Sequence, residues 1–348
     1  MNSQIVDILS SLDDSDKELL NEIQWTFPLV TRPFDAIAKK FDTTPEIIKE
    51  KLTHLKEIGV LRQLSAIFDT RKLGYTSSLV AMEIESDKLN HVANQINRHP
   101  GVSHNYERDH NFNLWFTLAV PPGTDFKTEL EKFNVLPGIK KVRMLPTIQF
   151  FKIGVKLDMV DGKKREIAPT EEKKEIKNIQ FIPTEQDKNF IRELQKDVEI
   201  IDEPFIKAAK NLGVTEEELF EKMKYYETIG VLRRFAAILR HRKVGFTANG
   251  MIVWKVPQDR IKSVGETLGS FPQISHCYER PTYEDWPYNV FSMIHCKTHD
   301  EANDVAKTIQ NQIDVDEYRI LFSSREFKKT RVEYFVENSF KLEDSAVL

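Results

Sequence analysis

Residues 59–74 have the sequence GVLRQLSAIFDTRKLG, and residues 230–245 have the sequence GVLRRFAAILRHRKVG. Nine of the sixteen positions are identical at a constant offset of 171 residues. A second pair of blocks follows in the same order, PGVSHNYER at 100–108 and PQISHCYER at 272–280, with six identities in nine positions. Ordered blocks of this kind indicate an internal duplication. The chain is therefore predicted to contain one module twice, as copy one over 1–155 and copy two over 185–340.

The same elements are expected in each copy. Helical stretches with a Thr N-cap (Thr44, Thr215) end at a glycine (Gly59, Gly230), which favours a left-handed C-terminal cap. The GVLR blocks then begin a strand. Downstream, period-two patterns at 77–84 and 248–256 predict strands. Next are expected a helix (87–99; 258–270), two strands around the SHxYER blocks, a helix, and a last strand (141–151; 316–322).

The order strand–helix–strand–strand–helix–strand is that of a ferredoxin-like αβ domain. Joined to a winged helix–turn–helix, it resembles the Lrp/AsnC family of transcription regulators, whose αβ domains pair. The resemblance implies an α+β protein folded as an intramolecular pseudo-dimer. The expected domains are a first helix–turn–helix (1–65), a first αβ domain (66–155), a charged linker (156–184), a second helix–turn–helix (185–236) and a second αβ domain (237–340).

Bulk composition restricts the function classes. The 348 residues are 40% hydrophobic and 30% charged, with a formal net charge of −4, which is typical of a globular protein and gives no polycationic surface for nucleic acid. We find no apolar run of the roughly 20 residues needed to cross a bilayer and no signal peptide at the start. The two cysteines have no CxxC spacing. A cytoplasmic protein without membrane partners is expected.

DNA binding is not expected, although the architecture suggests it. The candidate recognition helix of copy one, at 45–59, has three lysines against three glutamates. Its counterpart at 215–230 has five glutamates against two lysines. Neutralisation of phosphates supplies most non-specific DNA affinity, so a net acidic helix would be repelled. The helical parts are interpreted as a retained scaffold or a packing element of the pseudo-dimer.

Chemistry is expected where the copies differ. Asp69-Thr70 of copy one corresponds to Arg240-His241 of copy two, and Gln63 corresponds to Arg234. The alternative is a solvated turn, the usual role of a charged run. Close behind, SHCYERPTYEDWPYNVFSMIH at 275–295 concentrates histidines, an arginine and aromatic residues. If the two strands lie together, these side chains converge on one cavity. His295, in an apolar strand, is interpreted as structural.

These stretches carry a specific resemblance. IGVLRRFAAILRHRKVGFTANGMIVWKV with SHCYERPTYEDWPYNVFSMIH resembles the catalytic-type subunit of the siroheme decarboxylases, and AIFDTRKLGYTSSLVAMEI with VSHNYERDHNFNLWFTL resembles the partner subunit. The resemblance implies removal of two acetate carboxylates from siroheme to give 12,18-didecarboxysiroheme. It implies no organic cofactor, because the pyrrole ring itself accepts the electrons. The product leads to heme d1 or, by an alternative route, to heme, and the fused form favours heme d1.

The resemblance also implies roles for particular residues. His241 and His276 are expected to be the general acid pair, or one the acid and the other an axial ligand of the substrate iron. Arginine binds carboxylates bidentately. The residues expected to hold the propionate and acetate groups are Arg234, Arg240, Arg242 and Arg280. Those expected to line the macrocycle are Tyr278, Trp286 and Tyr288.

Copy one has the corresponding block of His104, Tyr106 and Arg108. These residues form a second site, a remnant, or one wall of a shared site, and the sequence leaves the three open. Two rival functions are a regulator that senses a tetrapyrrole and an amino-acid sensor of the Lrp type. A homodimer of the pseudo-dimer and contacts with other heme d1 biosynthesis proteins are further expected partnerships.

Overall fold

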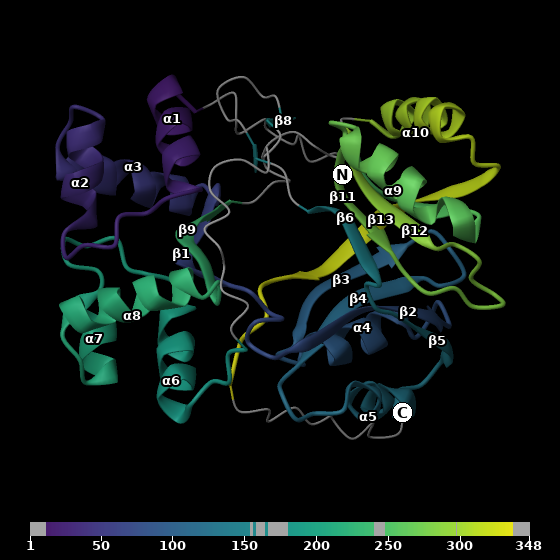
Figure 1. The fold of residues 1–348 in the computed structure, drawn as a ribbon, viewed down its shortest axis with the longest axis horizontal. Coiled ribbons are helices and arrows are strands. Elements are labelled where there is room, and N and C mark those ends of the chain that lie inside the picture. The colour runs from purple at the N-terminus through teal and green to yellow at the C-terminus, as the bar shows by residue number, and fades with distance from the viewer. Residues whose placement is uncertain are drawn as a thin grey trace. The chain divides into compact units, whose positions relative to one another are not determined.

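The computed structural model describes residues 12–153, 156–157, 164–165, 180–239, 248–296 and 298–336. The chain divides into two units, and each unit draws on both copies (Figure 1). The helical unit comprises 1–74 and 156–245, and the sheet unit comprises 75–155 and 246–348. Among the described residues, no helix is long and apolar enough to span a membrane.

In the described part of the helical unit, each copy contributes three helices and one longer strand. Copy one supplies α1 (Asp14–Ile23), α2 (Pro33–Lys40), α3 (Pro45–Glu57) and β1 (Leu61–Phe68). Copy two supplies α6 (Glu185–Leu194), α7 (Ile206–Leu212), α8 (Glu216–Thr228) and β9 (Leu232–Leu239). The linker region adds the short pair β7 (Lys156–Leu157) and β8 (Lys164–Arg165).

Caps set the ends of α3 and α8 as predicted. Thr44 Oγ1 accepts the backbone N–H of Ile47, and Thr215 Oγ1 accepts that of Glu218. Gly59 and Gly230, just past the two helices, have φ of 74° and 75°, the left-handed region where glycine has no steric penalty.

The two helix–turn–helix segments are joined through their strands. β1 and β9 pair antiparallel, so each copy contributes one strand to a sheet that neither could form alone. The contacts are reciprocal: the N–H of Phe27 donates to the carbonyl of Phe235 (3.2 Å), and the N–H of Val198 donates to the carbonyl of Leu64 (2.9 Å). Rings of both copies meet at Phe27, Phe205 and Phe235, with centroids 5.4–6.3 Å apart.

The sheet unit is one nine-stranded sheet in the order β5-β2-β4-β3-β13-β10-β12-β11-β6. Copy one supplies β2 (Thr76–Ile84), α4 (Leu89–Asn97), β3 (Val102–Arg108), β4 (Leu114–Val120), α5 (Phe126–Glu131), a 3-10 turn η2 (Lys132–Val135), β5 (Ile139–Leu145) and β6 (Gln149–Ile153). Copy two supplies β10 (Ala248–Lys255), the 3-10 turn η4 (Gln258–Arg260), α9 (Ile261–Ser270), β11 (Ile274–Glu279), β12 (Val290–Cys296), α10 (His299–Ile313) and β13 (Glu317–Lys329).

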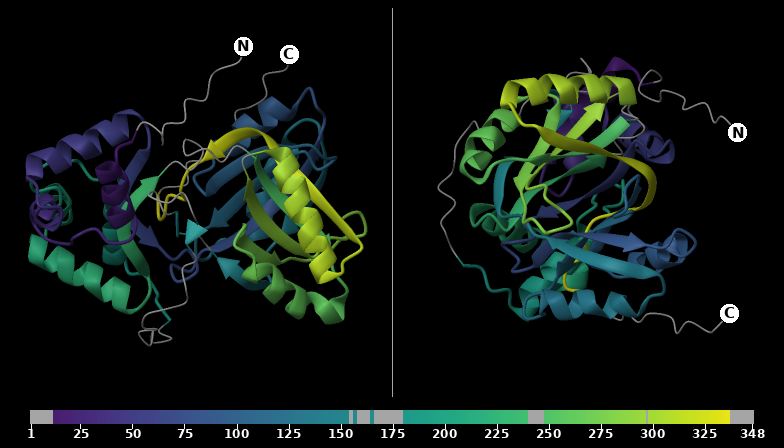
Figure 2. Two further views of the ribbon diagram at one scale, coloured as in Figure 1. Left: turned by 90° about the horizontal axis from the view of Figure 1, so that it is seen from above. Right: turned by 90° about the vertical axis from the view of Figure 1, so that its right-hand side faces the viewer.

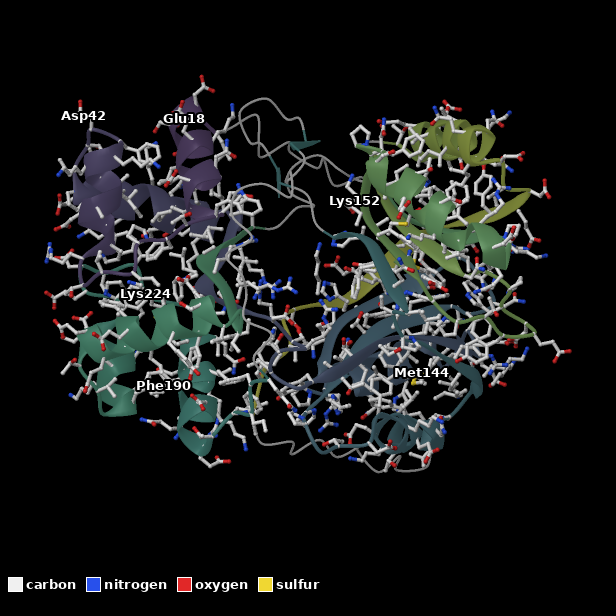
Figure 3. All side chains as sticks on the ribbon, in the orientation of Figure 1. Glu18, Asp42, Met144, Lys152, Phe190 and Lys224 are labelled. Atoms are coloured by element: carbon white, nitrogen blue, oxygen red, sulfur yellow. The ribbon has the colours of Figure 1, made fainter. Side chains whose placement is uncertain are left out.

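Each copy completes the other's edge. β6 leaves copy one and pairs antiparallel with β11 of copy two. The far half of β13, from Ser323 to Lys329, leaves copy two and pairs with β3 of copy one. In Figure 3, Met144 and Lys152 label β5 and β6, the two strands between which the chain crosses. The exchange is symmetric and ties the αβ domains into one sheet.

Among the described residues, three clusters of buried apolar side chains stabilise the sheet unit. Helices α4 and α5 cover the outer face of the copy-one strands, and α9 and α10 cover that of the copy-two strands, as the views in Figure 2 show. The third cluster lies on the inner faces and combines Trp115 and Leu145 of copy one with Trp286, Phe291 and Leu321 of copy two.

The predicted α+β pseudo-dimer of duplicated helix–turn–helix and αβ domains is confirmed. The single last strand predicted at 141–151 is wrong, because Pro146 lies in a break between β5 and β6. The strand predicted at 316–322 continues to Lys329 because its second half has a new partner, β3.

Candidate functional site

Strand β11 carries the predicted block on the inner face of the copy-two sheet. His276 Nδ1 lies 3.0 Å from Ser275 Oγ, and the His276 and Tyr278 rings stack with centroids 6.0 Å apart. The Arg280 guanidinium lies over the Tyr278 ring at 5.1 Å. The structure therefore brings His276, Tyr278 and Arg280 together in one row.

His276 is held neutral by its surroundings. Burial lowers its pKa to about 4, and the positive charge of Lys152 acts in the same direction. With Nδ1 occupied by Ser275, the ring nitrogen that remains for a ligand is Nε2. A neutral imidazole fixed through one nitrogen is the form that binds a metal through the other.

The depressed pKa predicts a pH dependence of stability. The unfolded chain returns His276 to about 6.5, so its contribution is fully present above pH 6.5 and is lost as the pH falls towards 4. The His276→Gln variant is expected to show a flatter decline of unfolding free energy in that window, by up to about 3 kcal/mol. Denaturant titrations at pH 7 and pH 4.5 measure it. Equal pH slopes for the variant and the parent protein would contradict the burial of a neutral ring.

Arg280 is a buried cation that forms no ion pair with an acid among the described residues. Its Nη1 donates to the carbonyl of Leu145 in copy one, while Nε has no hydrogen-bond partner among the described residues. Burial lowers its pKa to about 10, and Tyr278 opposes the shift weakly. An unpaired buried charge costs several kcal/mol, which an arriving carboxylate offsets.

Copy one repeats the arrangement. His104 Nδ1 lies 3.0 Å from Ser103 Oγ, and its ring lies 6.2 Å from that of Tyr106. The Arg108 guanidinium lies 5.8 Å from the Tyr106 ring and donates to the carbonyl of Leu321 in copy two.

The structure places Trp286 and Tyr288 in the inner core. Trp286 is 1% exposed, and its ring contacts those of Trp115 (5.2 Å) and Tyr288 (5.1 Å). The Tyr288 hydroxyl donates to Glu317 at 3.1 Å. Both rings therefore pack against protein, and a role for them in lining a macrocycle would require this cluster to open.

The loop that carries Trp286 fastens copy two to copy one. Asp285 accepts two hydrogen bonds from Arg143, at 2.9 and 2.8 Å, and the Tyr283 hydroxyl donates to the carbonyl of Met144 at 2.5 Å. With the Arg280–Leu145 bond, three consecutive residues of copy one are held by the block of copy two. Sequence reasoning did not find these partners, because nothing in the local pattern of 143–145 indicates them.

Strand β6 is a second feature that sequence reasoning missed. The Phe150 ring lies edge-on to Tyr278 at 5.4 Å, and Lys152 Nζ donates to the carbonyl of Phe271 at 2.9 Å. A strand of copy one therefore lies beside the row of His276, Tyr278 and Arg280. The residue from which a separate strand β6 could have been predicted is Pro146, which separates β6 from β5.

Arg234 lies in the helical unit, whereas the His276 row lies in the sheet unit. Its guanidinium stacks over the Trp25 ring at 4.4 Å, and its Nε has no hydrogen-bond partner among the described residues. Burial and the charge of Arg233 lower its pKa. The structure therefore shows Arg234 as a cation packed on an aromatic ring within the helical unit.

Arg240, His241 and Arg242 lie outside the described residues. Their copy-one counterpart is described: Asp69 accepts hydrogen bonds from Arg233 (3.1 and 2.6 Å) and from the N–H groups of Arg71 and Lys72. Burial disfavours the carboxylate, but these partners outweigh it and lower the pKa of Asp69. Asp69 therefore ties β9 to the turn after β1.

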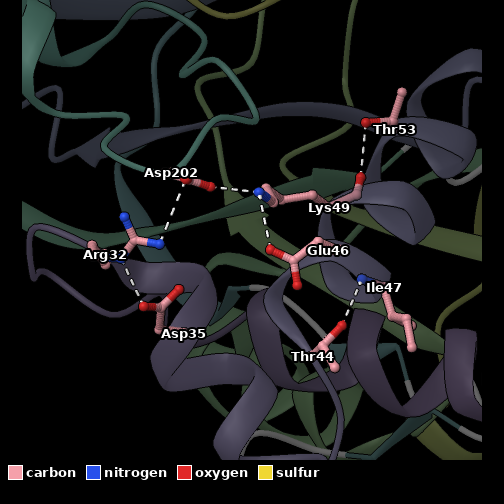
Figure 4. A network of polar contacts seen from close by, with 8 residues as sticks. All are labelled: Arg32, Asp35, Thr44, Glu46, Ile47, Lys49, Thr53 and Asp202. Atoms are coloured by element: carbon pink, nitrogen blue, oxygen red, sulfur yellow. Dashed lines mark hydrogen bonds and ion pairs between the residues drawn. The ribbon is translucent and has the colours of Figure 1, made fainter.

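The cations of the candidate recognition helix α3 are all paired. Lys49 bonds Asp202, whose other oxygen lies 3.5 Å from Arg32 (Figure 4). Lys51 pairs with Asp16 at 2.7 Å, and Lys56 pairs with Asp197. On α8, Lys222 pairs with Asp187 at 2.9 Å.

We accordingly predict no measurable binding of duplex DNA at about 0.15 M salt. Ion-paired lysines release few counterions from DNA, and counterion release drives non-specific binding. Fluorescence anisotropy with a labelled duplex, from 50 to 200 mM salt, measures it. Binding with a steep inverse salt dependence would support the regulator instead.

Comparison with known proteins agrees with this architecture. An AsnC-like ligand-binding domain matches residues 72–152 and 243–328, and a siroheme decarboxylase NirDL-like helix–turn–helix domain matches 16–62 and 187–233. A siroheme decarboxylase of Hydrogenobacter thermophilus is 41% identical over 92% of this chain and 95% of its own length. The siroheme decarboxylase beta subunit of Methanosarcina barkeri is 42% identical but spans only 42% of this chain, with 96% of its own length covered.

A solved structure is similar over nearly the whole chain. The siroheme decarboxylase NirDL superposes with a TM-score of 0.74 at 35% identity, over 94% of this chain and 96% of that one. The same values hold for NirDL in complex with an iron-uroporphyrin III analogue.

Proposed function

The chain belongs to the siroheme decarboxylase family, and from this we infer that it converts siroheme to 12,18-didecarboxysiroheme by removing two acetate carboxylates. It is a carboxy-lyase, and the reading as a transcription regulator has less support. We place the product on the route to heme d1, since the two halves are fused here as in the NirDL relatives.

The observation that carries the proposal within the structure is the row of His276, Tyr278 and Arg280. It offers a neutral imidazole whose ring centroid lies 6.0 Å from that of the Tyr278 ring, and a buried guanidinium 5.1 Å from the same ring; this guanidinium has no ion pair among the described residues. An iron tetrapyrrole with carboxylate side chains is complementary to all three groups, because it presents a metal, a flat π-surface and anions.

The chemistry proceeds on the substrate's own ring. Protonation of a pyrrole carbon makes the ring an electron sink, the bond from the acetate CH2 to its carboxylate breaks, and CO2 leaves. The electron pair enters the ring, and the exocyclic carbon then takes up a proton and becomes a methyl group while the pyrrole carbon releases the proton that it had gained. Each decarboxylation therefore consumes one proton overall, and a histidine with a pKa near neutrality is suited to deliver it.

The environment of His276 suggests a division of roles between the two histidines. Because the pKa of His276 is about 4, this ring is neutral at neutral pH and suited to bind the iron through Nε2. His241, which follows Arg240 and precedes Arg242, is then the general acid, with the two arginines binding carboxylates beside it. Arg280 holds a propionate or acetate group in the row.

A single experiment tests the function. Purified protein is mixed with siroheme without oxygen, and the absorption spectrum and released CO2 are followed together. The proposal expects two equivalents of CO2 per siroheme and a product lighter by both carboxylates in mass spectrometry. A spectral change without release of CO2 would instead identify a tetrapyrrole sensor. If neither a spectral change nor CO2 is observed, the protein does not bind a tetrapyrrole and the proposal is wrong.

A further inference from the structure

The block on β3 of copy one has the same internal geometry as the site row on β11. The Ser–His contact is 3.0 Å in both blocks. The His–Tyr ring distances are 6.2 and 6.0 Å, and the Arg–Tyr distances are 5.8 and 5.1 Å. The two blocks therefore share all three relations, so the groups that would bind a ligand in copy two are arranged in the same way in copy one.

Arg108 adds an independent observation. It is 6% exposed, and burial lowers its pKa to about 10, with Tyr106 the sole group acting in the opposite direction. Nη1 donates to the carbonyl of Leu321, and Nε has no hydrogen-bond partner in the described part of the chain. As at Arg280, the described residues show no ion pair between this buried cation and an acid, which favours a carboxylate ligand.

The neighbouring strands differ between the two blocks. β13 sets Glu326 opposite Tyr106 and Lys329 opposite His104. At the corresponding positions β6 sets Phe150 opposite Tyr278 and Ile153 opposite His276. The copy-one block therefore has a more polar edge, while the row in copy two is drier.

Copy one also lacks the residues that would deliver a proton. Where copy two has Arg240 and His241, copy one has Asp69 and Thr70, and Asp69 is bound to Arg233 and to two backbone N–H groups. An acid fixed in this way neither binds a carboxylate nor donates a proton at neutral pH.

We propose that copy one holds a second, non-decarboxylating binding site for a carboxylated tetrapyrrole, built on His104, Tyr106 and Arg108. The ligand class rests on the function proposed above, and the site itself rests on the geometry of β3. Each chain then binds two tetrapyrroles, of which only the one at the copy-two row is decarboxylated.

Titration with iron uroporphyrin III, followed by its visible absorption, tests the proposal on the full-length protein. Two equivalents per chain are expected for the unaltered protein. His104→Ala and His276→Ala are each expected to remove one equivalent, and the double variant to remove both. His104 is half-buried, so its truncation is compatible with folding, and a thermal melt of each variant verifies this; Arg108→Leu is the second probe of the same site.

Two outcomes overturn the second site. One equivalent in the unaltered protein, abolished by either histidine variant, would mean that both blocks are walls of a single shared site. The second outcome is that the unaltered protein binds one equivalent, that His276→Ala loses it, and that His104→Ala and Arg108→Leu still bind it. Copy one would then bind no tetrapyrrole. Decarboxylation of siroheme by the unaltered protein is measured in parallel, so failure of the function, seen as no CO2, is distinct from failure of the second site, seen as stoichiometry.

Discussion

Replacing His241, the proposed general acid, with alanine is expected to lower the rate of siroheme decarboxylation by about 10²–10⁴-fold, the usual contribution of a positioned general acid. Replacing His276, the proposed iron ligand, is expected to lower the rate because siroheme is then no longer held at the copy-two row. The two variants should differ in how they fail. His276→Ala removes the proposed iron ligand, so siroheme mixed with it should no longer show the spectral component that comes from binding at the copy-two row. His241→Ala leaves that ligand in place and should bind siroheme with an unaltered spectrum.

Anaerobic single-turnover kinetics with a diode-array spectrum measure rate and ligation in one experiment. His54→Ala, at an exposed position of α3, is the matched control for the loss of an imidazole elsewhere in the chain. Wild-type turnover in both histidine variants would contradict the proposed roles of His241 and His276. If His241→Ala alone changes the spectrum, the roles of ligand and acid are reversed.

Truncating Trp286 to alanine is expected to destabilise the protein by about 3–5 kcal/mol, the typical cost of removing a buried tryptophan side chain. The ring is 1% exposed and contacts Phe112, Trp115 and Phe291. It therefore joins the inner faces of the two αβ domains. At about 2–4 °C per kcal/mol for a unit of this size, the melting temperature should fall by roughly 6–20 °C.

Trp286→Phe is the matched control. It retains an aromatic ring and deletes an indole N–H that has no hydrogen-bond partner among the described residues, so its cost should be well below that of alanine. Calorimetry compares the melts, and siroheme titration compares binding. If Trp286→Ala melts like the parent protein but no longer binds siroheme, the structural role is contradicted. Trp286 would then contact the macrocycle, as the sequence predicts.

Much of the fold follows from local sequence. The repeated GVLR blocks, the Thr caps and the glycines after α3 and α8 each describe structure within one copy, and the structure confirms them. The exchange of β6 and β13 was not predictable in this way. Strand pairing between residues as distant as His104 and Lys329 depends on tertiary packing, and alternation along a strand does not reveal its partner.

The candidate site, like the fold, was predictable from the sequence only where it depends on local pattern. The grouping of His276, Tyr278 and Arg280 follows from their spacing of two along a strand. What surrounds them does not, since Phe150, Met144 and Leu145 come from copy one. Aromatic residues gathered in one stretch suggested a binding face at Trp286. A large apolar ring is more often buried, and here it packs between the inner faces of the two αβ domains.

The reciprocal completion of the sheet edges has a consequence for biosynthesis. When the first half of the chain leaves the ribosome, the outer edge of β3 has no partner, because the strand that covers it ends at Lys329, near the other end of the chain. Synthesis at about 5–20 residues per second leaves this edge open for tens of seconds, and open edges are where nascent chains associate with their neighbours. We therefore expect a chaperone that shields strand edges to raise the yield of native protein most strongly when it acts before the second copy is translated.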